Sequence, residues 1–348
     1  MQNTSQISYL ANSSDAFVAA CRDEGYRFVL ITETEVERKY AKPLLDAFKS
    51  AGLTIDLIVF PAGEASKTRE MKAQIEDQLF ALGCRRDTCL IALGGGVVSD
   101  LVGFIAATFC RGINVIYCPT TLLSMVDAAV GGKTAVNTPA GKNLIGAFKQ
   151  PNRINIDINT LSTLSDQEFK AGLVESMKHA LILDADLFQF MQTQKARILT
   201  RDQAVLTELV KRNVEIKLAI VVKDETEQGL REILNYGHTV GHAIERVSDY
   251  QISHGAAVAI GLVSEAKLAV KLGILALTDL TTIEALLSDY DIDATLPENL
   301  SVDEICDALL FDKKIKQGQL RCVILEAIGR VKSVESGFSK ADFKAVLA

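Results

Sequence analysis

The stretch LIALGGGVVSD, residues 90–100, decides the fold class. Apolar residues that favour a β-strand run into three consecutive glycines, and a helix-like apolar pattern follows. A glycine turn at the start of a helix lets the backbone and its unpaired N–H groups approach a phosphate closely. The spacing is not GxGxxG, so the ordinary dinucleotide fingerprint is absent, and glycine triplets also occur as plain tight turns. We predict a strand, a turn suited to a pyrophosphate, and a helix.

Two further features belong to the same expected sheet edge. Asp100 lies four residues after Gly96, on the side of the helix that faces the turn, although an acid there also simply complements the helix dipole. The pair Thr120-Thr121 follows the next strand, at the carboxyl edge where open α/β sheets bind ligands.

Strand-like runs alternate with helical periodicity through the first half of the chain. The expected strands are 26–32, 55–61, 88–93, 113–118 and 153–157, and the expected helices between them are 36–51 and 66–82. This alternation predicts a mostly parallel sheet with helices on its faces. From residue 165 long helical patterns dominate, for example at 204–223 and 256–272, with one late strand-like run at 320–325. We therefore expect an α/β Rossmann-like domain at 1–164 and a mainly α-helical domain at 165–348.

Composition narrows the functional class. The 348 residues are 48% hydrophobic and 23% charged, with a net charge of −7, which disfavours disorder and general nucleic-acid binding. Seven cysteines without CxxC spacing predict neither a disulfide framework nor a thiolate zinc site, and fit the reducing cytoplasm best. The polar N-terminus and the lack of a long apolar run predict no secretion signal and no membrane anchor.

Residues 126–148, VDAAVGGKTAVNTPAGKNLIGAF, combine two lysines, two asparagines and an aspartate with many small residues. Lys133 follows two glycines, and Lys142 and Asn143 follow another. This pattern favours paired contacts to an anion, made from flexible backbone. The alternative is that both lysines are solvated side chains of a loop.

Three of the four histidines lie within seventeen positions. His242 lies four positions after His238, so on a helix both imidazoles share one face and could bind a metal or a substrate together. His254 begins the next helical run. The alternative for any single histidine is an ordinary hydrogen-bonded or surface residue.

A carboxylate would normally complete a three-ligand catalytic zinc site. Glu175 has apolar neighbours and is the best candidate, although a Glu175–Lys178 pair three residues apart is usually a surface salt bridge. Arg231 and Asn235 come shortly before His238, and a guanidinium such as that of Arg231 suits a bidentate carboxylate.

Several of these motifs together resemble those of one known family. They are GGGVVSD, CPTTLLSMVDAAVGGKTAVN, GKNLIGAF, AGLVESMK, GLREILNYGHTVGHAIE, HGAAVAIGL and FDKK. Over residues 60–330 the chain resembles the 3-dehydroquinate synthases, which are sugar-phosphate cyclases. The resemblance implies a Rossmann-like domain that binds NAD, a helical domain that binds a divalent metal such as zinc or cobalt, and a homodimer.

The resemblance also implies roles for individual residues. The metal ligands would be Glu175, His238 and His254. The cofactor contacts would be Glu33, Glu64, Lys67, Gly95, Gly96, Val97, Asp100, Thr120, Thr121, Leu123, Asp127, Lys142, Asn143, Thr160 and Thr163. The catalytic residues would be Lys133, Lys178, Lys217, Arg231, Asn235 and His242. The substrate would also contact Asp127, Asn143, one of Lys313 or Lys314, and Arg111 of the partner subunit. Glu33 and Glu35 stand where the family usually has Asp and Asn, so a contact from Glu35 is in doubt.

The implied substrate is a small phosphorylated sugar acid, 3-deoxy-D-arabino-heptulosonate 7-phosphate, which the family converts to 3-dehydroquinate and phosphate in the shikimate pathway. NAD is reduced and reoxidised within each turnover, so the net reaction is that of a lyase. Two rival interpretations share the NAD and the metal. One is a cyclase that makes an inosose or a valiolone, and the other is a metal-dependent glycerol-type dehydrogenase, which would release NADH.

Overall fold

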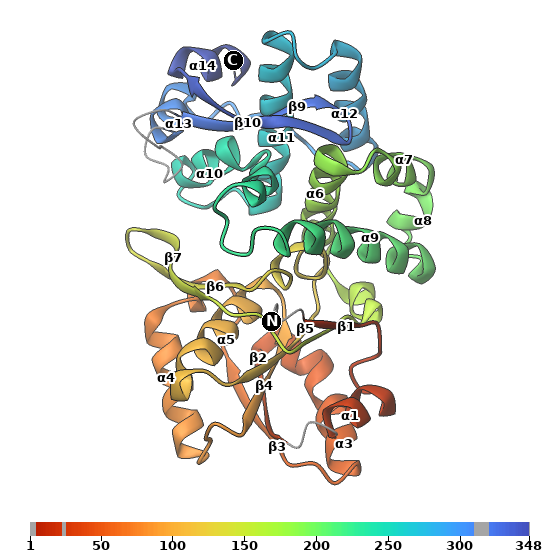
Figure 1. The fold of residues 1–348 in the computed structure, drawn as a ribbon, viewed down its shortest axis with the longest axis vertical. Helices are drawn as coiled ribbons and strands as arrows, with labels where there is room; N and C mark the ends of the chain where they lie inside the picture. The colour runs from red at the N-terminus through yellow and green to blue at the C-terminus, as the bar shows by residue number, and fades with distance from the viewer. Residues whose placement is uncertain (1–4, 23–25, 310–319, 348) are drawn as a thin grey trace. The chain divides into compact units, whose positions relative to one another are not determined.

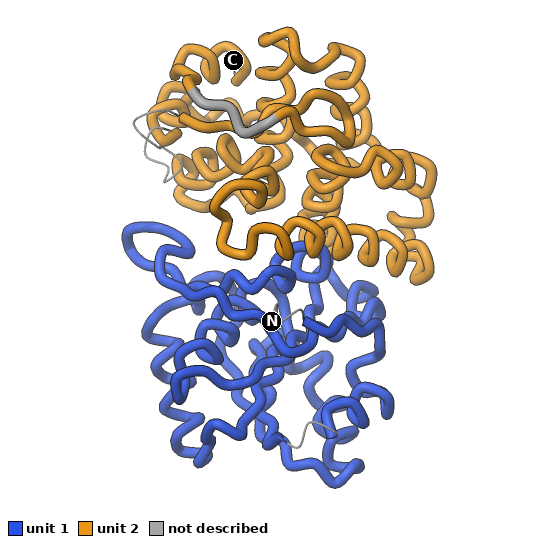
Figure 2. The backbone as a smooth tube through the Cα atoms, viewed as in Figure 1, with its two compact units in different colours: residues 1–164 blue, residues 165–348 orange. Residues whose placement is uncertain are grey.

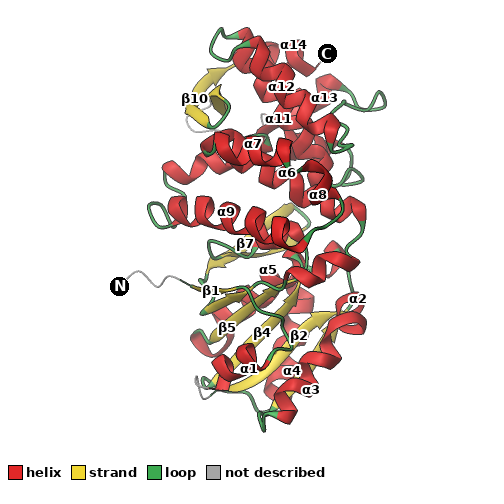
Figure 3. Ribbon diagram, turned by 90° about the vertical axis from the view of Figure 1, so that its right-hand side faces the viewer, coloured by secondary structure: helices red, strands yellow, loops and turns green. Residues whose placement is uncertain are grey.

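The computed structural model describes residues 5–22, 26–309 and 320–347, without the side chains of 333–336. Two compact units divide the chain (Figure 2). Unit 1 is Met1–Leu164 and unit 2 is Ser165–Ala348. Strands concentrate in unit 1 and helices dominate unit 2 (Figure 3). The fold class expected from the sequence, an α/β domain followed by a mainly helical domain, is confirmed.

Unit 1 is built on a parallel sheet (Figure 1). Among the described residues the strand order is β1-β8-β5-β4-β2-β3, and each neighbouring pair is parallel. The strands are β1 Gln6–Ser8, β2 Arg27–Glu33, β3 Ile55–Phe60, β4 Thr88–Gly94, β5 Asn114–Pro119 and β8 Arg153–Asn155. All five predicted strands are present. The sequence did not reveal β1, whose three residues lie in the polar N-terminal segment.

The strand order reverses at β2, which has β3 on one side and β4 on the other. In open parallel sheets, ligands bind beside the carboxyl ends of the strands at such a reversal. Here those ends are Glu33 of β2 and Gly94 of β4. The Thr32 hydroxyl donates to the Leu93 carbonyl at 2.7 Å, joining the two strands just before the reversal point.

Helices cover both faces of this sheet (Figure 1). They are α1 Asp15–Arg22, α2 Thr34–Val36, α3 Lys42–Ser50, α4 Arg69–Ala81 and α5 Gly96–Thr108, with a π-helical turn η1 at Glu37–Ala41. On one face Phe17 of α1 and Phe48 of α3 pack with Phe28 of β2, with ring centroids 5.3 Å apart for Phe28 and Phe48. On the other face α5 packs along β4 and β5. The strands are therefore buried from both sides, as their continuous apolar runs require.

The glycine-rich segment that was expected to be a flexible loop is a β-hairpin. Strands β6 Lys133–Thr138 and β7 Gly141–Phe148 pair antiparallel. Gly146 lets the two backbones come close, because a Cβ atom there would lie 1.9 Å from the carbonyl oxygen of Thr134. The expectation of flexible backbone is therefore wrong. The abundant small residues of this segment allow the two strands to pair closely.

Unit 2 is mainly helical. Its elements are α6 Asp166–Leu183, α7 Ala185–Thr193, α8 Lys195–Leu199, α9 Gln203–Val221, the 3₁₀ turn η6 Leu230–Asn235, α10 His238–Val247, α11 His254–Lys271, α12 Leu277–Asp289, α13 Val302–Leu309, β9 Leu320–Ala327, β10 Arg330–Phe338 and α14 Lys340–Leu347. The run predicted at 320–325 is β9, and β10, which the pattern did not reveal, pairs with it antiparallel. Among the described helices, none combines the length and the apolar character needed to cross a bilayer.

Helices α10 and α11 approach each other through glycines. Gly237, just before α10, has a φ of +78°, in the left-handed region that favours glycine. A Cβ atom on Gly261 of α11 would lie 1.9 Å from the Gly237 carbonyl oxygen, and one on Gly255 would lie 2.6 Å from Ala171 of α6. The start of α10 can pack this closely against the middle of α11, and the first turn of α11 against α6, only because side chains are absent at these positions.

This packing predicts that Gly261→Ala destabilises the protein. The added methyl group meets backbone, which cannot move aside cheaply, so we expect the free energy of unfolding to fall by about 1–3 kcal/mol. Urea unfolding followed by circular dichroism would measure the change. Gly229→Ala is the control, because nothing lies within 4 Å of a Cβ atom there. Equal stability of the two variants would contradict the proposed close contact.

Candidate active site

Three helices of unit 2 bring one carboxylate and two imidazoles together. Glu175 comes from α6, while His238 and His254 are the first residues of α10 and α11. Glu175 Oε1 lies 3.5 Å from His238 Nε2 and 3.4 Å from His254 Nε2. All three ligand atoms lie within 4.8 Å of one another. One carboxylate and two histidines are a donor set used by catalytic zinc sites, which leave further positions open.

Contacts to the second ring nitrogen orient both histidines. His238 Nδ1 lies 3.1 Å from the Tyr236 carbonyl oxygen. His254 Nδ1 lies 3.3 Å from Glu245 Oε2. Metal-binding histidines usually make such a contact, which turns the other nitrogen, Nε2, towards the metal. Both Nε2 atoms here face Glu175, so the outer contacts also fit a metal centre.

The electrostatics of the cluster favour a cation. Burial lowers the pKa of His238 well below its usual value, so its imidazole is neutral, as a ligand must be. Partial burial also lowers the pKa of His254, but hydrogen bonds and charges from Glu175 and Glu245 outweigh it and raise the pKa to about 10. The two carboxylates therefore hold a positive charge at His254, and a divalent ion between the ligands would supply that charge instead.

A second group of potential ligands overlaps the first. It consists of His242, Glu245 and His254, whose ligand atoms also lie within 4.8 Å of one another. His242 is exposed, and its ring centroid lies 5.3 Å from that of His238. Glu245 Oε2 contacts His254 Nδ1, the ring nitrogen that does not face Glu175. The Glu175 group is the better fit, because its donors are more buried and both histidines already carry outer contacts.

Buried cations lie in the same unit. Lys178 forms an ion pair with Glu175, and both side chains are almost fully buried, so this pair is not the surface salt bridge that such spacing usually forms. Lys217 of α9 and Arg231 of η6 are 6% and 1% exposed, and α6, α9 and η6 pack against one another. Cationic side chains gathered in this part of the unit suit the binding of an anionic substrate.

The segment before Arg231 is organised by a carboxylate that the sequence did not reveal. Asp224 accepts hydrogen bonds from the backbone N–H groups of Gln228, Gly229 and Arg231 at 2.8 to 2.9 Å. These bonds, led by that from Arg231, lower the pKa of Asp224. Asp and Asn residues commonly stabilise turns in this way, so the turn that presents Arg231 is preformed.

Two more polar contacts complete this region. Asn235 Nδ2 donates to Glu227 Oε1 at 2.8 Å, and Glu227 has a φ of +59°. The fourth histidine, His179, is fully buried and makes a 2.9 Å hydrogen bond with Asn213 of α9. His179 therefore joins α6 to α9, which is the ordinary structural role for a lone histidine.

Unit 1 gathers predicted cofactor residues around Lys67. Lys67 is 4% exposed and forms an ion pair with Asp100 of α5. Its ammonium group also donates to Asn143 Oδ1 of the β6–β7 hairpin at 2.6 Å. Glu64 accepts from the side chain of Asn137 at 2.7 Å. Residues far apart in sequence thus meet, and Asn137 is a member of the group that the sequence did not reveal.

The glycine turn leads from β4 into α5. Gly95, Gly96 and Val97 are partly exposed, while the strand before them is buried. A Cβ atom on Gly95 would lie 3.0 Å from Thr121, and one on Gly96 would lie 4.0 Å from Leu123. The predicted residues that follow β4 and β5 are therefore neighbours. The turn exposes the start of a helix, where N–H groups can bind a phosphate.

Other predicted residues of unit 1 have different surroundings. Glu33 caps α2, accepting from the N–H groups of Glu35 and Val36. The Thr160 hydroxyl donates to the Asp157 carbonyl at 2.8 Å, and Thr163 makes a hydrogen bond with Tyr40. Glu35 is exposed and pairs with Arg38 at 2.8 Å. Glu33 lies at the sheet reversal, whereas Glu35 is used in a surface ion pair.

The remaining predicted residues are mostly on the surface. Arg111 and Lys133 are exposed, while Lys142 and Asp127 are partly exposed. Arg111 has a φ of +68°, a strained conformation for a residue with a side chain. Lys313 and Lys314 lie outside the described residues.

Comparisons with known proteins identify the family. The descriptions "3-dehydroquinate synthase N-terminal" and "3-dehydroquinate synthase C-terminal" match residues 57–171 and 172–315. The 3-dehydroquinate synthase of Desulforamulus reducens is 43% identical over 325 residues, which cover 93% of this chain and 90% of that protein. The chain belongs to the 3-dehydroquinate synthase family. The 3-dehydroquinate synthase of Thermodesulfovibrio yellowstonii is 42% identical over 319 residues, which cover 91% of this chain and 89% of that protein.

Solved structures of related cyclases have the same fold. ValA, a 2-epi-5-epi-valiolone synthase from Streptomyces hygroscopicus with NAD⁺ and Zn²⁺ bound, matches with a TM-score of 0.90 and 25% identity, covering 98% of this chain and 94% of that one. A 2-deoxy-scyllo-inosose synthase complexed with carbaglucose-6-phosphate, NAD⁺ and Co²⁺ matches with a TM-score of 0.89 and 27% identity. This match covers 98% of this chain and 95% of that one.

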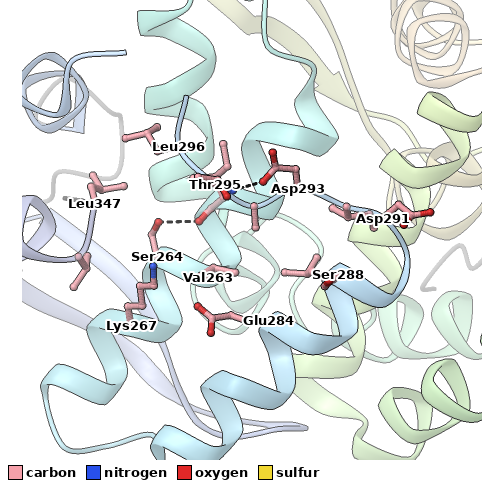
Figure 4. A pocket seen from close by; sticks show the side chains of 15 residues that line it. Val263, Ser264, Lys267, Glu284, Ser288, Asp291, Asp293, Thr295, Leu296 and Leu347 are labelled. Carbon is pink, nitrogen blue, oxygen red and sulfur yellow. Dashed lines mark hydrogen bonds between the residues drawn. The ribbon is translucent and has the colours of Figure 1, made fainter. Parts of the chain in front are cut away.

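A separate hollow of about 690 Å³ lies in unit 2, between α11, α12 and residues 291–296 (Figure 4). From α11 it is lined by Ser264 and Lys267, with Glu284 of α12 facing them. None of the site residues predicted from the sequence lines it. Its lining contains none of Glu175, His238 and His254, so the hollow is distinct from the histidine cluster.

The two overlapping ligand groups lead to a prediction that separates them. His254→Ala should abolish the retention of zinc, because this imidazole belongs to both groups. His242→Ala should leave the metal content unchanged, because the buried group does not need it. Metal analysis of the purified variants after dialysis tests both statements. Loss of zinc from His242→Ala, or normal zinc in His254→Ala, would show that the ligand assignment is wrong.

Proposed function

We propose that this chain is a lyase of the shikimate pathway that converts 3-deoxy-D-arabino-heptulosonate 7-phosphate to 3-dehydroquinate and phosphate. The observation that carries the proposal is the Glu175–His238–His254 group in a member of the 3-dehydroquinate synthase family. Identity of 43% to a 3-dehydroquinate synthase exceeds the 25% and 27% found with the valiolone and inosose cyclases. These values favour dehydroquinate as the product over the other cyclase products.

The proposed cofactors are NAD and a divalent metal, zinc or cobalt, as in the two cyclase structures. When bound, NAD accepts and returns a hydride, and the metal makes a substrate alcohol more acidic. Glu175, His238 and His254 would hold the metal. The remaining steps depend on how the chain binds the cofactor and the substrate.

For NAD, we propose that the turn at Gly95, Gly96 and Val97 binds the pyrophosphate at the start of α5. This position combines exposed N–H groups with the positive end of the helix dipole. Glu33 lies at the end of β2, where its carboxylate suits a ribose hydroxyl. The other residues proposed to contact NAD are Glu64, Lys67, Asp100, Thr120, Thr121, Leu123, Asp127, Lys142, Asn143, Thr160 and Thr163.

For the substrate, the residue types divide by the group that they would bind. Lys133, Asn143, one of Lys313 or Lys314, and Arg111 of a partner subunit would bind the phosphate. Lys217 and Arg231 would bind the carboxylate, for which a guanidinium offers two parallel hydrogen bonds. Lys178, Asn235 and His242 suit the hydroxyl groups, and imidazole is the side chain best suited to proton transfer near neutral pH. Asp127 completes the proposed set.

The proposed setting is the cytoplasm and the proposed assembly is a homodimer. Cysteine usage supports the first point, since a chain with seven cysteines and no disulfide pattern suits a reducing compartment. The second follows from the role given to Arg111, which is exposed and would reach a neighbouring subunit. An acidic chain can still bind a substrate with two anionic groups, because the field of clustered lysines and arginines is local.

The central test is an assay with purified protein, NAD and zinc. We expect phosphate release from the heptulosonate phosphate without accumulation of NADH, because the hydride returns within each turnover. Released phosphate and absorbance at 340 nm would be followed together. Stoichiometric NADH would indicate a dehydrogenase instead, and absence of phosphate with NAD and metal both bound would refute the proposal.

A second test concerns the carboxylate contact. Arg231→Lys keeps the charge but loses the planar pair of donors, so we expect kcat/KM to fall about 10- to 100-fold, mainly through a higher KM. Metal content should not change. Arg212→Lys is the matched control, because Arg212 pairs with Asp184 at 3.2 Å and is not assigned to the substrate. A normal KM for Arg231→Lys would argue against this role.

A further inference from the structure

The buried carboxylate of Glu265 has no assigned role, although it lies on the helix that begins with a metal-ligand candidate. Glu265 is fully buried on α11. We propose that Glu265 is a positioning residue for the metal centre, which caps the first turn of α10 and thereby places His238 opposite Glu175 and His254. This inference rests on the proposed metal site.

The contacts of Glu265 are those of a helix cap supplied by another helix. Its Oε2 accepts from the N–H of Gly237 at 2.8 Å. Its Oε1 accepts from the N–H groups of Thr239 and Val240 at 3.2 and 3.4 Å. These groups belong to the start of α10, where backbone N–H groups have no partner within the helix. One carboxylate therefore binds the residues on both sides of His238.

The chain needs such a cap because α10 cannot supply its own. Helices usually begin at Ser, Thr, Asp or Asn, whose side chain accepts from the first turn. Here Gly237 occupies that position. Glycine is favoured there by its left-handed backbone, and a Cβ atom at this position would lie 2.7 Å from the Leu262 side chain and 3.1 Å from the Leu262 backbone nitrogen. A carboxylate from outside also interacts favourably with the positive end of the helix dipole.

The same cap ties the two histidine helices together. The Tyr236 hydroxyl donates to the Leu262 carbonyl at 2.7 Å, so α11 holds the chain before α10 as well. The Tyr236 carbonyl contacts His238 Nδ1. Contacts from Leu262 and Glu265 therefore determine where the His238 ring lies relative to His254, the first residue of α11. A shift of this turn would move His238 Nε2 without altering any ligand.

The test compares metal binding in three variants with the wild type. Glu265→Gln keeps the size but replaces one acceptor with an amino group that faces backbone N–H donors. Glu265→Asp keeps the charge but shortens the reach. Glu284→Gln, an exposed position on α12, is the matched control. Zinc affinity is measured by competition with a chromophoric chelator, and ligand geometry is followed by the visible spectrum of the Co²⁺-loaded protein.

We expect Glu265→Gln to weaken zinc binding about 10- to 100-fold, as substitutions of outer contacts typically do, and to change the Co²⁺ spectrum. Glu265→Asp should restore part of the affinity, and Glu284→Gln should match the wild type. Affinity within twofold of the wild type with an unchanged spectrum would overturn the proposal, even if the variant were less stable. If Glu265→Gln does not fold, Glu265→Asp decides by the same criterion. Failure of both to fold would reject a positioning role in favour of a purely structural one.

The wild-type measurement keeps this test separate from that of the function. Wild-type protein that binds no zinc would refute the proposed metal site itself. Equal zinc affinity of the wild type and of Glu265→Gln would refute only the role of Glu265.

Discussion

In unit 2 the carboxylate of Glu175 is almost completely buried, and a buried charge is costly unless opposite charges and hydrogen-bond donors surround it. The fold supplies them from three helices, through Lys178 on α6 and the imidazoles at the starts of α10 and α11. The close glycine packing of those helix starts, the cap from Glu265 and the contact from Glu245 all serve this arrangement. A site that compensates a buried anion in this way is also one that a divalent cation fits.

In unit 1 the proposed binding groups are largely backbone N–H groups, whereas in unit 2 they are charged and ionisable side chains. Its sheet reverses order at β2, and the turn after the neighbouring strand β4 is free of side chains, so the start of α5 is open to a phosphate. Lys67 then joins α5 to the β6–β7 hairpin through Asp100 and Asn143. The two units thus offer complementary chemistry, one suited to a dinucleotide and the other to a metal and an anionic substrate.

Much of this could be predicted from local pattern and residue type. Five strands, the long helices and the mainly helical second half follow from periodicity, which is set by each segment on its own. The glycine turn, the clustered histidines and Glu175 were visible as candidates, and the resemblance to a family strengthened the assignment of Glu175. Patterns were weaker where segments were short, mostly polar or rich in small residues. The three residues of β1 and the mostly polar β10 were therefore not predicted, and the β6–β7 hairpin was interpreted as flexible backbone.

The sequence by itself therefore determined the fold class and the family, and it supplied the candidate residues for the proposed chemistry. Only the tertiary structure decided which distant groups meet: Glu265 with the first turn of α10, Glu245 with His254, and Lys67 with Asn143. It also decided that Glu175 and Lys178 are buried and that His179 has a structural role. Spacing along one helix specifies which residues share a face, but it carries no information about which other helix that face will contact. The outer contacts of the site depend on that packing.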